Sequence, residues 1–469
     1  MTLVEQMTQL QTRQLTAVEL VLDSLQAAKK WQGAVNAFVE VDAEGALAAA
    51  EASDKRRAAA RAMSALDGIP LALKDMFDRP GHCSRFGSRF LQDPVATAAT
   101  IVQRLGDAGA VTVGSLNMAE FALGPTGHNS VFGHCRNPWD TERITGGSSS
   151  GAAAAVAAGI VAGSIGSDSG GSIRIPAACC GTVGLKPTHG RVSVDGAMPL
   201  TPSLDCIGPF ARTAVDCTIL FRLIAGAAPP VEPEPPPAAA VRLAFPAEAI
   251  ARDADPEIAD AIEAAVSVFS RQGARIVPAR LPDIAALHRL AETVQQSEAA
   301  AVHRERVRQH RALYTPHILH RVEAGLSVAA PDYIDALHQR ATHRSAFIAD
   351  TLGDAHALVV PVLGFAVPRI DATDEAALGG SSAPSASSAI VARMTRWTRW
   401  ISYLGVPALS IPCGVDRHGL PVGLQLVGRL FSEMTLLQLA RQFQEATQWH
   451  SRMPSLATEP ASGAHNLAR

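Results

Sequence analysis

Residues 146–151 read Gly-Gly-Ser-Ser-Ser-Gly, and residues 166–174 read Gly-Ser-Asp-Ser-Gly-Gly-Ser-Ile-Arg. An isolated Gly/Ser cluster is typical of a flexible linker. These two clusters, however, flank an uncharged, Ala-rich segment at 152–162, so a buried setting is expected for all three. The pattern predicts two hydroxyl-rich loops that bracket one buried helix. The apolar run at 152–165 is too short to span a bilayer and predicts a buried helix.

Two kinds of site use glycine-rich loops of this type. One cradles phosphate at a helix N-terminus, but no G-x-x-x-x-G-K-[ST] occurs, and Lys186 precedes a proline. The other is a serine nucleophile, because glycines beside it let backbone N–H groups face a developing oxyanion. Residues 147–151 formally match G-x-S-x-G, but that motif needs a histidine base downstream, and His128 and His134 precede it. The base must be sought elsewhere.

Hydrophobic periodicity predicts an α/β fold outside the two loops. Thr16 and Glu19 form a capping-box pattern that opens a helix, and the first sixty or so residues are expected to be helical. Short apolar runs then alternate with helical stretches, so the sheet is expected to begin near residue 69. We predict helices at 46–63, 100–108, 255–272, 292–313 and 433–447, strands at 69–73, 111–113, 241–244, 358–362, 408–411 and 422–427, an extended connection at 227–240 and a loop at 379–388.

Composition narrows the class of protein. The chain has 469 residues, 47% of them hydrophobic and 18% charged, as expected for a globular protein. With 41 Lys plus Arg against 44 Asp plus Glu, no nucleic-acid partner is expected. Seven cysteines without a C-x-x-C argue against a disulfide framework and against a zinc site. We expect a cytoplasmic protein with no membrane partner, since nothing near Met1 reads as a secretion signal.

The residues that point to a family begin at 68–75, which read Gly-Ile-Pro-Leu-Ala-Leu-Lys-Asp. Together with the two Gly/Ser clusters they resemble the amidase signature family. The resemblance continues through 180–188 and 203–209 and, more loosely, through 405–428. It implies an α/β fold with a mixed central β-sheet surrounded by α-helices in a single amidase domain. We divide that domain into an N-terminal helical region (1–63), a core with the site (64–227), a variable substrate-side segment (228–400) and a completion of the core (401–469).

The resemblance also assigns roles to residues. It implies that Lys74 is the catalytic base, Ser148 a proton relay that follows a cis peptide, and Ser172 the acylated nucleophile. It places the oxyanion hole at backbone N–H groups of Ser169, Gly170, Gly171 and Ser172 itself. A lysine with the usual pKa of about 10.4 is protonated at neutral pH, so Lys74 must be desolvated to act as a base.

Substrate-binding residues are predicted from the same resemblance. Residues 118–130 correspond to a loop that lines the acyl pocket, and Thr-Gly-His-Asn-Ser at 126–130 departs from the Ser-Thr-Glu-Asn-Ser of glutaminase subunits. We therefore expect His128 and Asn129 at the substrate, although a structural histidine fits equally well. Arg340 lies near the position where the glutaminase branch keeps an arginine for a carboxylate, and a solvated arginine is its alternative. Asp168 and Arg174 are expected to support the nucleophile as an ion pair or to act directly.

The predicted function is hydrolysis of a carbon–nitrogen bond in a small amide, aryl amide or carbamate-like substrate. No metal and no organic cofactor is expected. The resemblance further implies a homodimer, for which the helical N-terminal region is the expected contact. Alternatives are the glutamine-hydrolysing subunit of an amidotransferase, a carboxybiuret or allophanate hydrolase, and an inactive scaffold subunit, which a fluorophosphonate that labels Ser172 would distinguish.

Overall fold

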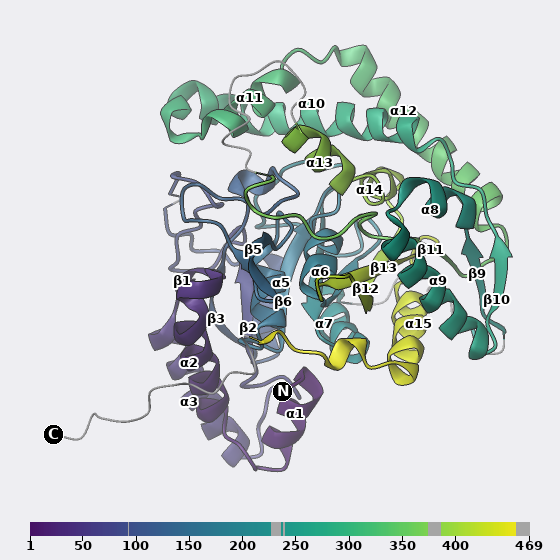
Figure 1. The fold of residues 1–469 in the computed structure, drawn as a ribbon. Helices are drawn as coiled ribbons and strands as arrows, with labels where there is room; N and C mark the ends of the chain where they lie inside the picture. The colour runs from purple at the N-terminus through teal and green to yellow at the C-terminus, as the bar shows by residue number, and fades with distance from the viewer. Residues whose placement is uncertain (92, 227–235, 238–239, 374–385, 456–469) are drawn as a thin grey trace.

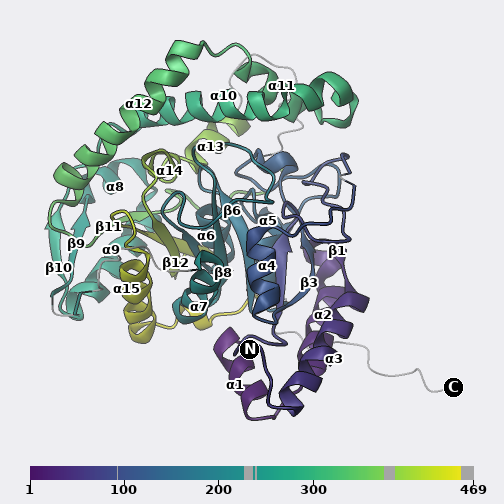
Figure 2. The same ribbon diagram turned by 180° about the vertical axis from the view of Figure 1, so that it is seen from behind.

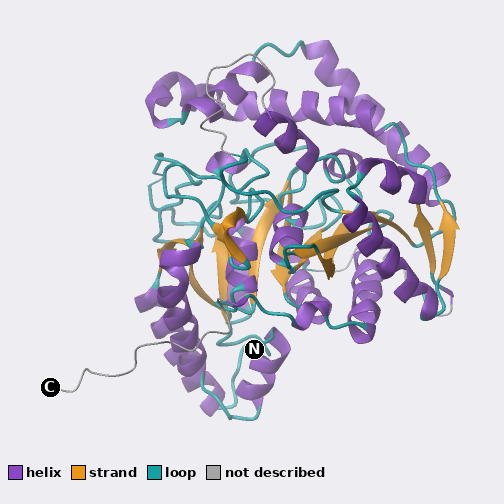
Figure 3. Cartoon of the chain, in the orientation of Figure 1, coloured by secondary structure: helices purple, strands orange, loops and turns teal. Residues whose placement is uncertain are grey.

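The computed structural model describes all residues except 92, 227–235, 238–239, 374–385 and 456–469. An eleven-stranded sheet runs through the molecule, and helices surround it (Figure 1, Figure 3). The sheet confirms the predicted α/β class. Its strands, in spatial order, are β1 (Phe38–Val41), β3 (Val111–Leu116), β2 (Pro70–Lys74), β6 (Gly163–Asp168), β8 (Cys206–Ala211), β7 (Val183–Lys186), β12 (Ala408–Val415), β13 (Pro421–Val427), β11 (Ala357–Pro361), β9 (Arg242–Phe245) and β10 (Arg275–Pro278).

The sheet is mixed, as predicted. β2 pairs in parallel with both β3 and β6, whereas β6 pairs antiparallel with β8. Two further strands, β4 (Arg136–Asn137) and β5 (Asp140–Ile144), form a separate antiparallel pair. β2 and β6 are buried along their whole length, because helices cover both faces of the sheet at this point.

Two groups of helices lie on opposite sides of the molecule. α1 to α3 lie together near the N-terminus, and α10 to α12 lie together beyond the other end of the central strands (Figure 1, Figure 2). No helix among the described residues combines the length and apolar composition needed to cross a membrane. The helices are α1 (Leu3–Gln11), α2 (Ala17–Val35), α3 (Ala43–Ala58), α4 (Thr100–Asp107), α5 (Ser150–Ala157), α6 (Arg174–Cys180), α7 (Ala214–Ala225), α8 (Ala247–Asp253), α9 (Pro256–Arg271), α10 (Ile284–His310), α11 (Pro316–Gly325), α12 (Ala330–Ala346), α13 (Ala386–Met394), α14 (Arg399–Leu404) and α15 (Glu433–Ala446), with short turns η1 (Glu120–Ala122), η3 (Arg311–Leu313), η4 (Phe347–Leu352) and η6 (Trp449–Ser451).

Most of the predicted helices and strands are present, although the helices predicted at 46–63 and 292–313 begin earlier, as α3 and α10. The expectation that the first sixty or so residues are helical and that the sheet begins near residue 69 is wrong, because β1 pairs with β3 at the edge of the sheet. Thr16 and Glu19 form the expected capping box at the start of α2, with reciprocal hydrogen bonds between side chain and backbone. The predicted strands at 69–73 and 422–427 are β2 and β13. The predicted connection at 227–240 and loop at 379–388 fall largely outside the described residues, and residues 386–388 begin α13.

The prediction of one helix over 152–165 is wrong in its second half. α5 ends at Ala157, and Gly159 then adopts a left-handed conformation with φ of 70°, which turns the chain away from the helix. The second Gly/Ser cluster is likewise not all loop, because Gly163–Asp168 forms the central strand β6. Small residues are required there: a Cβ at Gly166 would lie 2.8 Å from the Oγ of Ser149.

Candidate active site

Lys74 is the last residue of β2, and its side chain is only 1% exposed. Its Nζ lies 2.7 Å from the Oγ of Ser148 and 2.8 Å from the Oγ of Ser167. Burial lowers the pKa of Lys74 to about 7, although the carboxylates of Asp205 and Asp168 act in the opposite direction. A lysine with this pKa is partly uncharged at neutral pH, so it can accept a proton from a neighbouring hydroxyl group.

Ser148 stands in the loop that enters α5, and its peptide bond to Gly147 is cis. Its side chain is fully buried. α5 approaches the sheet closely because all eight of its residues are buried and none is larger than valine. A Cβ at Gly151 would lie 2.2 Å from the carbonyl oxygen of Ala37, so only glycine permits this approach. The close packing holds Ser148 against the end of β2.

Ser172 lies in the loop between β6 and α6 and lines a narrow pocket. The backbone N–H of Ser149 donates to the carbonyl oxygen of Ser172 at 3.4 Å, which ties the two serine-bearing loops together. Unlike Ser148, Ser172 is partly exposed. Of the three candidate catalytic side chains, it is the one that a substrate in the pocket can reach.

Asp168 and Arg174 form a fully buried ion pair with a distance of 2.9 Å between Oδ1 and Nη2. Burial alone would raise the pKa of Asp168, but the Arg174 guanidinium outweighs it and lowers the pKa to about 2. The carboxylate also accepts from the backbone N–H groups of Gly171 and Ile173, at 2.8 and 3.1 Å. The ion pair therefore holds the nucleophile loop in its conformation, which is the supporting role that was one of the two expected for these residues.

The predicted oxyanion loop lies against the pocket, with one difference from the prediction. Gly170, Gly171 and Ser172 line the pocket, and Ser169 donates through its hydroxyl to Asp205. The N–H of Gly171 is already bonded to Asp168, so it is not available to a substrate oxygen in this conformation. Among the described residues, no acceptor is bonded to the N–H groups of Gly170 and Ser172.

The three predicted substrate-binding residues are not among those that line this pocket. The Nε2 of His128 lies 2.9 Å from the hydroxyl of Thr373. The side chain of Asn129 is buried, and its amide donates to the carbonyl oxygens of Gly87 and Met118. Arg340 donates to the carbonyl oxygen of Ser203 at 2.7 Å. The 118–130 loop nevertheless reaches the pocket, through Ala122, Gly124 and Pro125.

Four polar residues of the pocket wall were missed by sequence reasoning. All four belong to the segment 228–400, where the resemblance was weakest, and no periodicity marks them. Two of them, Gln295 on α10 and Arg321 on α11, belong to helices of the upper layer (Figure 1). The other two are Thr395, shortly before α14, and Arg399, at the start of α14.

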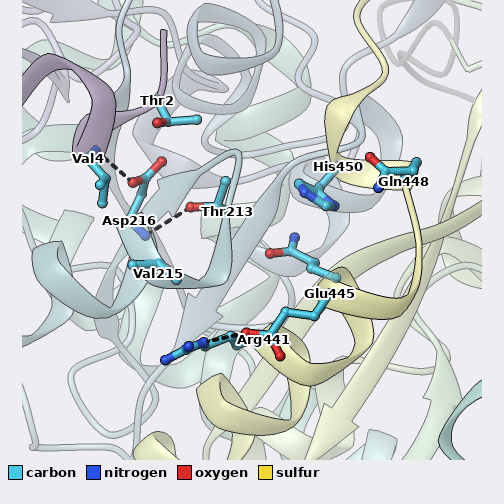
Figure 4. Close-up of a pocket in the computed structure, with 10 residues that line it drawn as sticks. Thr2, Val4, Thr213, Val215, Asp216, Arg441, Glu445, Gln448 and His450 are labelled. Atoms are coloured by element: carbon cyan, nitrogen blue, oxygen red, sulfur yellow. Dashed lines mark hydrogen bonds and ion pairs between the residues drawn. The ribbon is translucent and has the colours of Figure 1, made fainter. Parts of the chain in front are cut away.

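A larger hollow lies elsewhere, between the N-terminus, α7 and α15 (Figure 4). It measures about 520 Å³, against about 20 Å³ beside Ser172. Its charged groups bond to one another or to the backbone: Asp216 accepts from the N–H of Val4, and Arg441 donates to Glu445. Its described lining contains neither serine nor lysine, whereas Ser172 lines the smaller pocket, so chemistry rather than size selects the smaller pocket as the candidate site.

Comparison with known proteins gives a consistent family assignment. Residues 19–437 match the family model described as Amidase. A glutamyl-tRNA(Gln) amidotransferase subunit of Roseiflexus sp. (strain RS-1) is 37% identical, covering 98% of this chain and 100% of that protein. The same subunit of Neisseria meningitidis is 33% identical and covers 95% of this chain and 97% of that protein.

Solved structures agree with the sequence comparison. The crystal structure of an amidase superimposes with a TM-score of 0.84 at 32% identity, over 95% of this chain and 99% of that one. A protein from a vestigial complex connected with the origins of an s-triazine catabolic enzyme gives a TM-score of 0.84 at 30% identity, over 95% and 98% of the two chains. The peptide amidase of Stenotrophomonas maltophilia gives 0.81 at 28% identity, over 97% and 98%.

Proposed function

Because the chain belongs to the amidase family, we propose that Ser172, Ser148 and Lys74 together hydrolyse the carbon–nitrogen bond of a small amide. The observation that carries the proposal is the contact of 2.7 Å between the Nζ of Lys74 and the Oγ of Ser148. Burial brings the pKa of that lysine to about 7, within the working range of a general base. Ser172 supplies the nucleophile at the pocket.

In the first half of the reaction, neutral Lys74 takes the proton of Ser148 while Ser148 takes the proton of Ser172. The Oγ of Ser172 then forms a bond to the carbonyl carbon. The negative charge that develops on the carbonyl oxygen is stabilised by backbone N–H groups, those of Gly170 and Ser172 being unengaged by protein acceptors among the described residues. When the carbon–nitrogen bond breaks, the leaving amine receives its proton through Ser148. The product of this half is an acyl ester on Ser172.

In the second half, water takes the place of the amine. The same relay removes a proton from the water as its oxygen attacks the ester carbonyl carbon. The bond to the Ser172 Oγ then breaks, and that oxygen is reprotonated as the carboxylic acid leaves. No step needs a metal ion or an organic cofactor.

A second candidate function is the hydrolysis of glutamine within an amidotransferase. Its support is the 37% identity to a glutamyl-tRNA(Gln) amidotransferase subunit over nearly the whole of both chains. A nitrogen-rich small molecule is a further candidate substrate, since one similar solved structure is connected with the origins of an s-triazine catabolic enzyme. The loop at 126–130 departs from the glutaminase sequence at His128, but His128 does not line the Ser172 pocket, so an activity measurement must separate the two functions.

The test is ammonia release by the purified chain alone, with glutamine and a neutral aryl amide compared at matched concentrations. Release that depends on Ser172 supports the proposal, and a neutral fluorophosphonate must label the same serine. Release from glutamine alone would select the amidotransferase function and call for partner subunits. A chain that neither hydrolyses an amide nor labels at Ser172 would be the inactive scaffold.

The proposal extends to partners and location. We propose a small-molecule amide as substrate, a homodimer in solution and a cytoplasmic location. The last is supported by the seven cysteines, all of which are free thiols in the fold. Light scattering on the purified chain measures the dimer directly.

A further inference from the structure

Two arginines and a glutamine line the pocket together with Ser172, and they come from three different elements. Arg321 belongs to α11, Arg399 to α14 and Gln295 to α10. We propose that Arg321 and Arg399 bind a carboxylate of the substrate, so that the enzyme hydrolyses a short amide that also carries a carboxylate. This inference rests on the proposed function and narrows it to one substrate class.

Arg399 carries the strongest evidence, because this partly exposed residue has a buried Nε and forms no ion pair with the described residues. Its Nε is buried and has no hydrogen-bond partner. A Cβ at Gly170 would lie 4.0 Å from this Nε, which places the guanidinium beside the oxyanion loop. Burial lowers the pKa of Arg399, and the nearby charge of Arg321 lowers it further. A charge held in this way is costly unless a partner arrives.

The surrounding residues do not supply that partner. Within the described part of the chain, neither Arg399 nor Arg321 forms an ion pair. Glu292, one turn before Gln296 on α10, attracts Arg399 through space. Its carboxylate is exposed, however, accepts from the side chain of Gln296, and is not part of the pocket wall. Two neighbouring cations therefore face one small space whose described lining offers no anion.

A planar carboxylate is the ligand that fits this arrangement. Guanidinium groups bind carboxylates through paired N–H groups, and two guanidinium groups can share one carboxylate. The pocket space of about 20 Å³ holds roughly one water molecule, so an acyl group must be short and must displace a side chain on binding.

The same wall discriminates against an amino acid. The pocket-lining residues that the structure describes include no Asp and no Glu, and the remaining polar groups are Gln295, Thr395 and Ser172. Among the described residues of this wall, the ammonium group of glutamine would therefore meet two arginines and no carboxylate. A monoamide of a short dicarboxylic acid, which has a carboxylate but no ammonium, meets both conditions. We assign this class as the substrate.

The experiment compares three amides of similar size by ammonia release: succinamate, neutral butyramide and zwitterionic glutamine. We expect kcat/KM for succinamate to exceed that for butyramide by about 100-fold, the loss typical when a desolvated charge pair is missing. Arg399→Gln should lower the succinamate-to-butyramide ratio by more than about tenfold, and Arg399→Lys should restore part of it. Arg308→Gln, which changes an exposed arginine on α10, is the matched control and should leave the ratio unchanged.

Other outcomes overturn the inference. A succinamate-to-butyramide ratio near one in the wild type would do so, and so would an equal loss of both activities in Arg399→Gln, which would indicate a role at the oxyanion instead. A ratio that falls only in Arg340→Gln would move the carboxylate site to that residue. If Arg399→Gln does not fold, Arg321→Gln replaces it.

A separate measurement distinguishes failure of the proposed function from failure of the carboxylate site. Reaction of Ser172 with a neutral fluorophosphonate reports the nucleophile without using the arginines. If that labelling is absent and no amide is hydrolysed, the proposed function is wrong. If labelling occurs but no amide turns over, succinate should slow the labelling of the wild type more than butyrate does, and equal protection by the two acids would contradict the carboxylate site alone.

Discussion

The Nζ of Lys74 lies 2.7 Å from the Oγ of Ser148, although 74 positions separate them in the chain. β2 brings the lysine to the end of the sheet, and the close packing of α5 brings the serine to the same point. The ammonium group is thus removed from water and placed against a hydroxyl group. Experiments can test both the effect of burial on the pKa of Lys74 and the catalytic role of its contact with Ser148.

Ser172→Ala should abolish hydrolysis, with kcat lowered by about 10⁴-fold or more, because members of a nucleophile–base unit act together. Lys74→Ala should come close to the same loss. Steady-state ammonia release measures both, with Ser270→Ala, which changes an exposed serine on α9, as the control. Turnover close to that of the wild type by either variant would refute the mechanism.

The pH dependence follows from the lowered pKa of Lys74. The base acts in its neutral form, which is the minor form below a pH of about 7 and the major form above it. We expect kcat/KM to rise about tenfold per pH unit below this pKa and to level off above it. A profile measured from mildly acidic to mildly alkaline pH on a neutral amide tests this. A flat profile through neutral pH would contradict the assignment of Lys74 as the group that titrates.

Asp168→Asn should destabilise the fold by about 3–5 kcal/mol, because it leaves the Arg174 guanidinium buried without its counter-charge. Urea unfolding at neutral pH measures the free energy. The pKa of Asp168 is lowered to about 2, so its contribution is present above the ordinary carboxyl pKa of about 4 and is lost as the pH falls toward 2, and the variant should lack this loss. Arg441→Gln removes an exposed pair with Glu445 and should cost under about 0.5 kcal/mol.

Gly171→Ala should disrupt the nucleophile loop. Gly171 has a φ of 137°, and a Cβ there would lie 2.4 Å from the Oγ1 of Thr398. We expect a loss of both stability and Ser172 labelling. Gly106→Ala on α4 is the contrasting variant: its Cβ would meet nothing within 4 Å, and it should stabilise the protein by about 0.5–1 kcal/mol. Equal effects at the two glycines would show that the close contact is irrelevant.

Asn129→Ala tests whether this residue serves the substrate or the loop. Its side chain donates to two carbonyl oxygens and accepts from the N–H groups of Val131 and Phe132. Removing a buried, fully bonded amide should cost about 2–4 kcal/mol in thermal or urea unfolding. A rise in KM with unchanged stability would instead return Asn129 to the substrate site.

Local signals in the sequence predicted much of the architecture. Capping residues marked the start of α2, and short apolar runs marked β2 and β13, because these features depend on neighbours in the chain. The run at 152–165 was misread because buried helix and buried strand are both apolar, and periodicity cannot separate them. The turn at Gly159 and the pairing of β6 with β2 and β8 decide between the two.

At the site, motif residues within short segments identify the chemical groups: two serines, a lysine and glycine-rich loops. The side chains that surround these groups depend on how the whole chain packs. In the folded chain, Arg340 lies outside the lining of the Ser172 pocket, whereas Arg321 and Arg399 line it. The N–H of Gly171 donates to Asp168. A pocket wall is made by side chains from helices far apart in the chain, and the approach of those helices depends on packing rather than on any local pattern.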